Sequence, residues 1–207
     1  MATSIGTAGV TFPAGGVGNP AGTVVGTTDS QTLTNKTLST GLVMGASAIT
    51  SGTAVASTSG TSIDFTGLPS WVKRITVMFV GVSISTNTQN VSLQIGSGSV
   101  ETTNYVGSSA RITNAPAAAW DSVLTTMFQI GGFNASTDTL SGTAILSLAG
   151  SNIWTLTGSV FRSSGTTPAI CFFSGTKTTS GALDRLRITT TNGTDTFDAG
   201  SINILYE

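Results

Sequence analysis

From Ser62 to the C-terminus, the chain carries short runs in which hydrophobic and polar residues alternate, separated by Gly, Asn, Asp and Ser. In residues 91–95 this alternation places Val91, Leu93 and Ile95 on one face and two polar residues on the other. A period of two is typical of strands that bury one face. Short strands with turn residues between them predict an all-β fold, an antiparallel, jelly-roll-like β-sandwich of about nine strands.

Three runs nearer the C-terminus follow the same rule. The residues that share a face are Trp154 with Leu156, Leu186 with Ile188, and Ile202 with Ile204 and Tyr206. Asn192-Gly193 stands between the last two runs. This pair is the strongest short hairpin signal, because both central positions of a type I′ turn need a positive φ. The sequence therefore predicts a hairpin at Asn192 and a core position for Trp154.

The run of residues 74–82 is apolar on both faces. Ile75, Val77 and Phe79 alternate on one side, and Met78, Val80 and Val82 on the other. In an antiparallel sandwich, one face of a strand normally meets water. We therefore expect the second face to meet a neighbouring subunit or a covering loop, and Met78, Val80 and Val82 are candidate residues of a subunit interface.

Residues 1–60 have a different character. They contain two charged residues, Asp29 and Lys36, and one aromatic residue, Phe12. Burying a Val or Ile contributes roughly 1.5–3 kcal/mol, whereas fixing each backbone residue costs roughly 1–2 kcal/mol. A segment so poor in large apolar groups needs partners, either identical copies winding into a narrow stem or a larger host structure along which it lies.

The spacing of Leu33 and Leu38 breaks strict alternation, and Asn35 between them favours a turn or bulge. The two leucines are the candidate contacts of a trimeric stem. We expect two parts, an extended stem or docking segment over residues 1–60 and a β-sandwich head over residues 61–207.

Composition narrows the class of protein. The chain has 38 Thr and 27 Ser, only 8% charged residues and 39% hydrophobic residues. A net charge of −1 gives no basis for binding nucleic acid. No apolar run approaches the roughly 20 residues that cross a bilayer, and the N-terminus lacks the pattern of a signal peptide, so we expect neither membrane insertion nor export by that route.

Residues 28–38, TDSQTLTNKTL, resemble a segment that recurs in tail-fibre and appendage proteins of tailed bacteriophages. Residues 9–13 and 201–207 also resemble the ends of such proteins. The resemblance implies a homotrimer on the virion, made in the host cytoplasm, whose N-terminal part docks on other virion proteins and whose head contacts a host surface glycan or protein. Many tail fibres are much longer, with repeated shaft modules, so a short tail fibre and a capsid-mounted head fibre or decoration protein both fit.

Candidate chemistry is sparse. The chain has no His, which excludes Ser-His-Asp and Cys-His arrangements. A glycan-degrading tailspike enzyme is the less favoured hypothesis, and it would need a pair of carboxylates. The candidates, none in a recognisable motif, are Asp64, Glu101, Asp121, Asp138, Asp184, Asp195 and Asp198. We expect these carboxylates to lie in solvated turns or at strand ends, and we expect no enzyme activity.

Asp195 and Asp198, with Asn192 nearby, have a spacing that Ca²⁺ can use, yet they lack the ligand count of a recognised loop. We therefore expect no metal and no cofactor. The single Cys171 lies in an apolar run and is expected to be a buried, hydrophobic thiol.

Aromatic faces can stack on sugars, although core packing is their commoner role. The candidates are Trp71, Trp120, Trp154, Tyr105 and Tyr206. Trp120 follows the Ala- and Pro-containing run 114–119, which is typical of a loop. It is the candidate receptor-binding residue.

Overall fold

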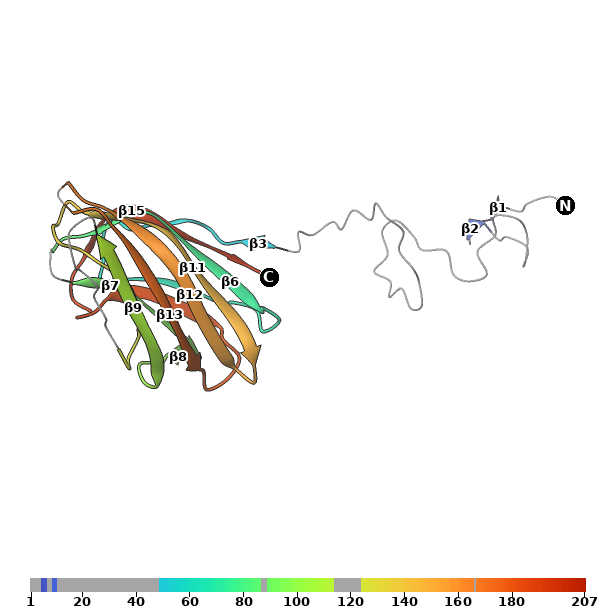
Figure 1. Ribbon diagram of the computed structural model, residues 1–207. Coiled ribbons are helices and arrows are strands. Elements are labelled where there is room, and N and C mark those ends of the chain that lie inside the picture. The colour runs from blue at the N-terminus through green and yellow to red at the C-terminus, as the bar shows by residue number, and fades with distance from the viewer. Residues whose placement is uncertain (1–4, 7–8, 11–48, 87–88, 114–123, 166) are drawn as a thin grey trace. The chain divides into compact units, whose positions relative to one another are not determined.

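The structure, a computed structural model, describes residues 5–6, 9–10, 49–86, 89–113, 124–165 and 167–207 (Figure 1). The chain divides into two compact units, Met1–Gly45 and Ala46–Glu207. In the first unit, β1 (Ile5–Gly6) pairs antiparallel with β2 (Gly9–Val10). Leu33 and Leu38 lie outside the described residues, so the stem contacts expected of them stay predictions.

The second unit is all-β, and every strand pair in it is antiparallel. Its strands are β3 (Thr50–Ser51), β4 (Val55–Ala56), β5 (Ser62–Thr66), β6 (Arg74–Ile84), β7 (Asn90–Ser97), β8 (Ser99–Val100), β9 (Tyr105–Thr113), β10 (Phe128–Gly132), β11 (Thr139–Gly150), β12 (Ile153–Ser163), β13 (Ala169–Thr178), β14 (Arg185–Thr190) and β15 (Phe197–Tyr206). No helix occurs in the described residues, and so none there could cross a membrane.

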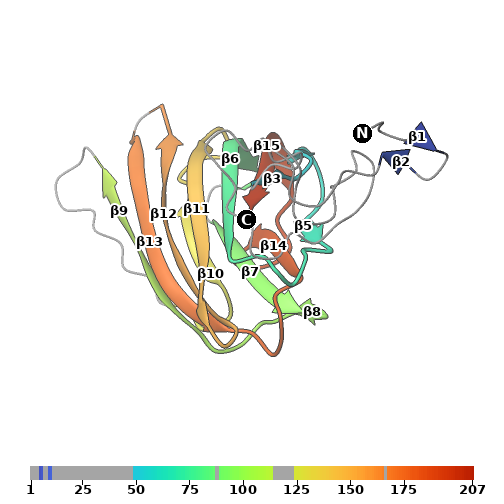
Figure 2. The same ribbon diagram turned by 90° about the vertical axis from the view of Figure 1, so that its right-hand side faces the viewer.

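These strands form two sheets that face each other. The large sheet has the order β3-β15-β6-β11-β12-β13-β9, with β4 also paired to β15. The small sheet has the order β10-β7-β14-β5, with β8 paired to β7. In Figure 2, β9, β13, β12, β11 and β6 follow one another in a row, and β7 and β14 belong to the second layer. The predicted all-β, antiparallel, sandwich-like fold is confirmed.

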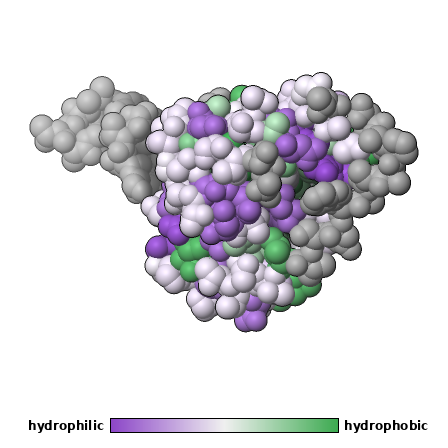
Figure 3. Space-filling model, turned by 90° about the vertical axis from the view of Figure 1, so that its left-hand side faces the viewer, coloured by the Kyte–Doolittle hydropathy of each residue, from purple (hydrophilic) through white to green (hydrophobic). Residues whose placement is uncertain are grey.

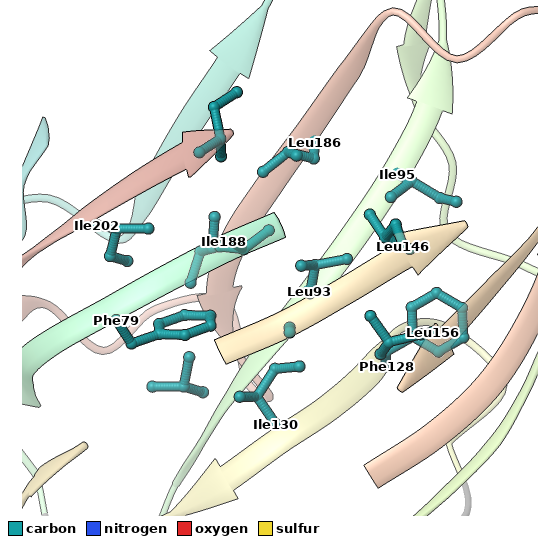
Figure 4. Close-up of a cluster of buried hydrophobic side chains, with 14 of the residues drawn as sticks. Phe79, Leu93, Ile95, Phe128, Ile130, Leu146, Leu156, Leu186, Ile188 and Ile202 are labelled. Carbon is teal, nitrogen blue, oxygen red and sulfur yellow. The ribbon is translucent and has the colours of Figure 1, made fainter. Parts of the chain in front are cut away.

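Alternation explains the core between the sheets. Val91, Leu93 and Ile95 of β7 and Leu186 and Ile188 of β14 are fully buried, as the period of two predicts, but Ser92 and Gln94 on the other face of β7 are buried as well. Side chains from the large sheet, among them those of β6, β11, β12 and β15, meet them from the other side (Figure 4). The described unit therefore has a complete hydrophobic core of its own.

Strand β6 departs from the sequence prediction at Gly81, whose φ is +61°. Phe79 pairs with Gly142 but Val82 pairs with Leu140, so β6 carries an extra residue at this point and forms a bulge. The bulge reverses the alternation and turns Val82 inward, where it is fully buried in the core. The expectation that Val82 belongs to an outer interface with Met78 and Val80 was wrong for this reason.

The other two outward residues of β6 remain on the outer face. Met78 is partly buried, and Val80 is 63% exposed. At Met78 and Val80 the outer face of β6 is thus apolar, and among the residues that the structure describes no loop buries Val80. Their role in a subunit interface stays a prediction.

Asn192-Gly193 does not form the predicted hairpin, because β14 and β15 belong to different sheets. Gly193 has a φ of +70°, but Asn192 does not have a positive φ. Instead, Asn192 Oδ1 accepts hydrogen bonds from the backbone N–H groups of Thr194 (3.1 Å) and Asp195 (3.2 Å). The turn that has positive φ at both central positions lies at Ser151 and Asn152, between β11 and β12.

The sheet begins before residue 61, the expected start of the head. Strands β3 and β4 both pair with β15. The Gly52 N–H donates to the Ile204 carbonyl (2.8 Å), and the Ser57 N–H donates to the Gly200 carbonyl (2.9 Å). Residues 50–57 therefore belong to the β-sandwich unit rather than to a stem.

Candidate functional site

Two carboxylates that sequence analysis singled out form ion pairs on the outer side of the small sheet. Asp64 of β5 receives two hydrogen bonds from the Arg187 guanidinium, at 2.7 and 3.0 Å. Asp184 receives two from Arg185, at 2.8 and 3.2 Å, and these bonds hold the pKa of the Asp184 carboxyl below its usual value. Each carboxylate is therefore paired with an arginine and accepts hydrogen bonds from it.

Glu101 lies at the centre of a polar cluster beside β13. Its carboxylate is 2.5 Å from Lys177 Nζ and accepts a hydrogen bond from the Ser180 N–H at 2.8 Å. Burial acts to raise the pKa of Glu101, but the hydrogen bonds from Lys177 and Ser180 outweigh it and lower the pKa. The Lys177 ammonium also lies 5.4 Å from the centre of the Tyr105 ring. The cluster ties β13 to the turn that precedes β9.

The Tyr105 hydroxyl joins the same region to β7. It accepts a hydrogen bond from the Ile95 N–H at 2.9 Å and donates to the Glu101 carbonyl at 2.9 Å. The Tyr105 ring is 1% exposed and packs edge-on against Phe128 at 4.8 Å. Burial raises the pKa of this hydroxyl well above its usual value. Tyr105 is a core residue with its polar end satisfied, rather than a sugar-stacking surface.

Asp138 and Arg162 form a buried pair at one end of the large sheet. Their side chains are 1% and 0% exposed, with Arg162 Nε 3.7 Å from Asp138 Oδ2. Asp138 accepts hydrogen bonds from the N–H groups of Asn134 and Ala135, and Arg162 donates to the Gly132 carbonyl. Burial lowers the pKa of Arg162. The pair fixes the turn before β11 against β12.

The remaining acidic candidates do not gather into one site. Asp195 accepts a hydrogen bond from the Thr86 hydroxyl at 2.7 Å, and Asp198 is exposed on β15. The side-chain oxygen of Asn192 accepts hydrogen bonds from backbone N–H groups of its own turn. In the part of the chain that the structure describes, no three His, Cys, Asp or Glu side chains could hold a metal ion together. Asp121 lies outside those residues.

Cys171 is confirmed as a buried thiol, 3% exposed, and burial raises its pKa. It borders a cavity of about 20 Å³ together with Arg111 and Gln129. A space of this size holds about one water molecule, which excludes a substrate of ordinary size from it.

Aromatic residues are divided between core and surface. Trp154 is 2% exposed and lies in the core, as predicted. Trp71 is 53% exposed, and its ring centre lies 5.8 Å from that of the partly buried Tyr206. Trp120, the predicted receptor contact, lies outside the described residues.

Large apolar side chains are exposed on the outer face of the large sheet, and sequence analysis missed most of them. Phe161 of β12, Ile112 of β9 and Ile170 and Phe172 of β13 are 45–63% exposed. Figure 3 shows one side of the molecule, where hydrophobic patches in green interrupt the hydrophilic areas. The sequence signal that could have found them is the run of residues 169–173, in which both alternating sets are apolar, as in residues 77–80.

The small sheet presents the opposite chemistry. Its outward positions carry the paired charges of Asp64, Arg185 and Arg187. The most prominent candidate for function is therefore an apolar contact surface on the large sheet. No family model, curated protein or solved structure matches the chain.

Proposed function

We propose that this chain is a structural, non-enzymatic subunit of a tailed-bacteriophage particle, a short homotrimeric tail fibre involved in host attachment. The observation that carries the proposal is the exposed apolar surface of a unit that already has a complete core. Large apolar patches left on a finished domain are typical of protein contact sites. Such a unit functions through contacts with other molecules rather than through a catalytic pocket.

Two further features support the fibre assignment. Residues 28–38 resemble the recurring segment of tail-fibre and appendage proteins. The chain also divides into a unit of residues 1–45 and a larger β-rich unit, the organisation of a docking part followed by a jelly-roll-like head. The head would contact the host, and the first unit would dock on other virion proteins.

Immunogold labelling of intact phage particles with antibody against the purified chain tests this assignment. We expect label at the tail, and we expect the purified chain to compete with phage for adsorption to the host. Label only on the capsid would move the protein to a head fibre or decoration protein. Particles without label would contradict a virion role altogether.

Trp120→Ala tests the attachment residue predicted from the sequence. We expect the variant to compete less well for host adsorption, by about 10-fold or more, because a stacked aromatic contact contributes much of the binding free energy where it occurs. Trp71→Ala, another aromatic substitution at an exposed site, is the control and should leave adsorption unchanged. Unchanged adsorption by the Trp120→Ala chain, with unchanged mass, would remove Trp120 as a receptor contact.

A further inference from the structure

Four neighbouring strands of the large sheet present an outer face without any charge. The outward positions of β9, β13, β12 and β11, as fixed by their pairing, are all Ser, Thr, Ala, Val, Ile or Phe. The charged residues of these strands, Arg111, Arg162 and Lys177, occupy the alternate, inward positions. The outer face of a water-exposed sheet normally carries mixed charges, as the small sheet does here.

The largest side chains of this face form a continuous row across three strands. Ile112 pairs directly with Ile170, and Ile170 pairs directly with Phe161. Phe172 lies on the same face, two residues along β13 from Ile170. These four side chains, which we call the apolar ridge, are 63%, 45%, 49% and 45% exposed in the order Ile112, Ile170, Phe161 and Phe172.

A shallow hollow of about 510 Å³ lies on the same face, toward the other end of β9 and β13. Its lining includes Val106, Ser108, Thr155, Ser174 and Thr176. Gly107 and Gly175, which pair with each other across β9 and β13, contribute only backbone to the hollow, because a side chain at either position would point inward toward Phe128. One face thus carries both a projecting apolar ridge and a depression with hydroxyl groups around it.

We propose that this face docks on the other copies of the same chain in the homotrimer, with the three apolar ridges next to one another around the three-fold axis. A charge-free face buried against its own kind leaves no charge unpaired, and buried unpaired charges are what weaken an interface most. Nucleic acid and anionic lipid surfaces need clustered Lys and Arg, which this face does not have.

The size of the face agrees with this partner. Four strands about 4.8 Å apart and about ten residues long span roughly 650 Å², and adding the part of β6 that carries Met78 and Val80 brings the area to roughly 700 Å². A stable protein contact buries about 800 Å² on each partner. The paired charges on the small sheet keep the other side of the sandwich in water, so association through one face closes into a finite assembly rather than a stack.

The proposal rests on the proposed function only in taking the particle-bound protein to consist of several copies.

Ile170→Lys in the full chain places a charge at the middle of the ridge. Ile170 is 45% exposed, so the lysine can reach water in the isolated chain and the fold should persist. Thr66→Lys adds the same charge at an exposed strand position on the outer side of the small sheet and is the matched control.

Mass by light scattering at micromolar concentration gives the result, and circular dichroism reports the fold of each variant. We expect a multimer for the wild-type chain and for Thr66→Lys, and an association about 30-fold weaker or more for Ile170→Lys, as for loss of a central contact residue. Ile170→Ser adds no charge and should weaken association less than Ile170→Lys. It replaces Ile170→Lys in the test if the lysine variant fails to fold.

A multimeric Ile170→Lys chain of unchanged affinity, or a monomeric wild-type chain, would overturn the docking face. Particle labelling is independent of both results. Labelled tails together with a multimeric Ile170→Lys chain would overturn the interface and leave the fibre assignment standing. Unlabelled particles together with a monomeric Ile170→Lys chain would overturn the fibre assignment and leave the interface standing.

Discussion

At the scale of single residues, the charged side chains of this protein mainly form ion pairs that link strands and turns. The chain has few of them, and Asp64, Glu101, Asp138 and Asp184 each lie in an ion pair. Exposed pairs of this kind contribute little to stability, whereas removing one partner of a buried pair is costly because the other charge is left without compensation. Lys177 is such a case, since its side chain is 3% exposed beside Glu101.

Glu101→Gln should lower the free energy of unfolding by about 1–3 kcal/mol at pH 7, because it removes the charge that faces the buried Lys177. The pKa of Glu101 is lowered in the folded chain from its ordinary value of 4.5. The stabilisation that follows from this shift is present above about pH 4.5 and is lost as pH falls through the folded-state value. Wild type and variant should therefore converge toward pH 3.

Urea unfolding at pH 7, 5, 4 and 3 measures this convergence. Asp198→Asn, at an exposed position of β15, is the control and should track the wild-type chain at every pH. A difference between wild type and Glu101→Gln that stays constant from pH 7 to pH 3 would show that the Glu101 carboxylate does not carry the effect.

At the scale of elements, the β6–β15 contact shows how a bulge decides which face a side chain occupies. Gly81 has a φ of +61° and donates its N–H to the Ser141 hydroxyl at 2.9 Å. On the neighbouring strand, Gly200 has a φ of +92° and lies against the Gly81 carbonyl. The two irregularities lie side by side and together turn Val82 into the core.

Alanine substitutions separate backbone strain from steric overlap at this bulge. A Cβ at Gly81 meets no atom within 4 Å, so Gly81→Ala should destabilise by about 1–2 kcal/mol, the cost of a left-handed conformation. A Cβ at Gly200 would lie 2.4 Å from the Gly81 carbonyl oxygen, so Gly200→Ala should cost about 2–5 kcal/mol. Equal urea midpoints for the two variants would contradict this packing.

At the scale of the whole molecule, the sandwich has two unlike outer surfaces and an N-terminal edge that is part of the sheet. The small sheet presents paired charges to water, and the large sheet presents the apolar ridge. Strands β3 and β4 extend the large sheet along β15. The unit that folds and associates should therefore start near Ala46, rather than at residue 61.

Shortened chains test this boundary. Residues 46–207 should unfold at the same temperature as the β-rich unit of the full chain and keep its multimeric mass, because core and ridge are both retained. Residues 61–207 should be less stable by about 2–4 kcal/mol, since β15 loses its backbone hydrogen bonds to residues 52 and 57 and part of its cover. Thermal unfolding and light scattering measure both, and equal stability of the two chains would place the boundary at residue 61.

The sequence alone determined the local features of this protein. Alternation in residues 91–95, the shared face of Leu186 and Ile188, and the core position of Trp154 follow from strand geometry, in which neighbouring side chains point to opposite faces. Burial of Cys171 followed from its apolar neighbours. The apolar run of residues 74–82 also indicated a strand with a second apolar face, which the structure shows at Met78 and Val80.

Only the tertiary structure decided which strands are neighbours, and much of the surface depends on that. Asn192-Gly193 has the local chemistry of a hairpin, yet its flanking strands pair with different partners, and the turn with two positive φ values falls at Ser151 and Asn152. Val82 faces inward because of a bulge set by two adjacent strands. The apolar ridge exists because pairing aligns Ile112, Ile170 and Phe161, which lie on three strands, and such alignment is a property of register that no single run of sequence contains.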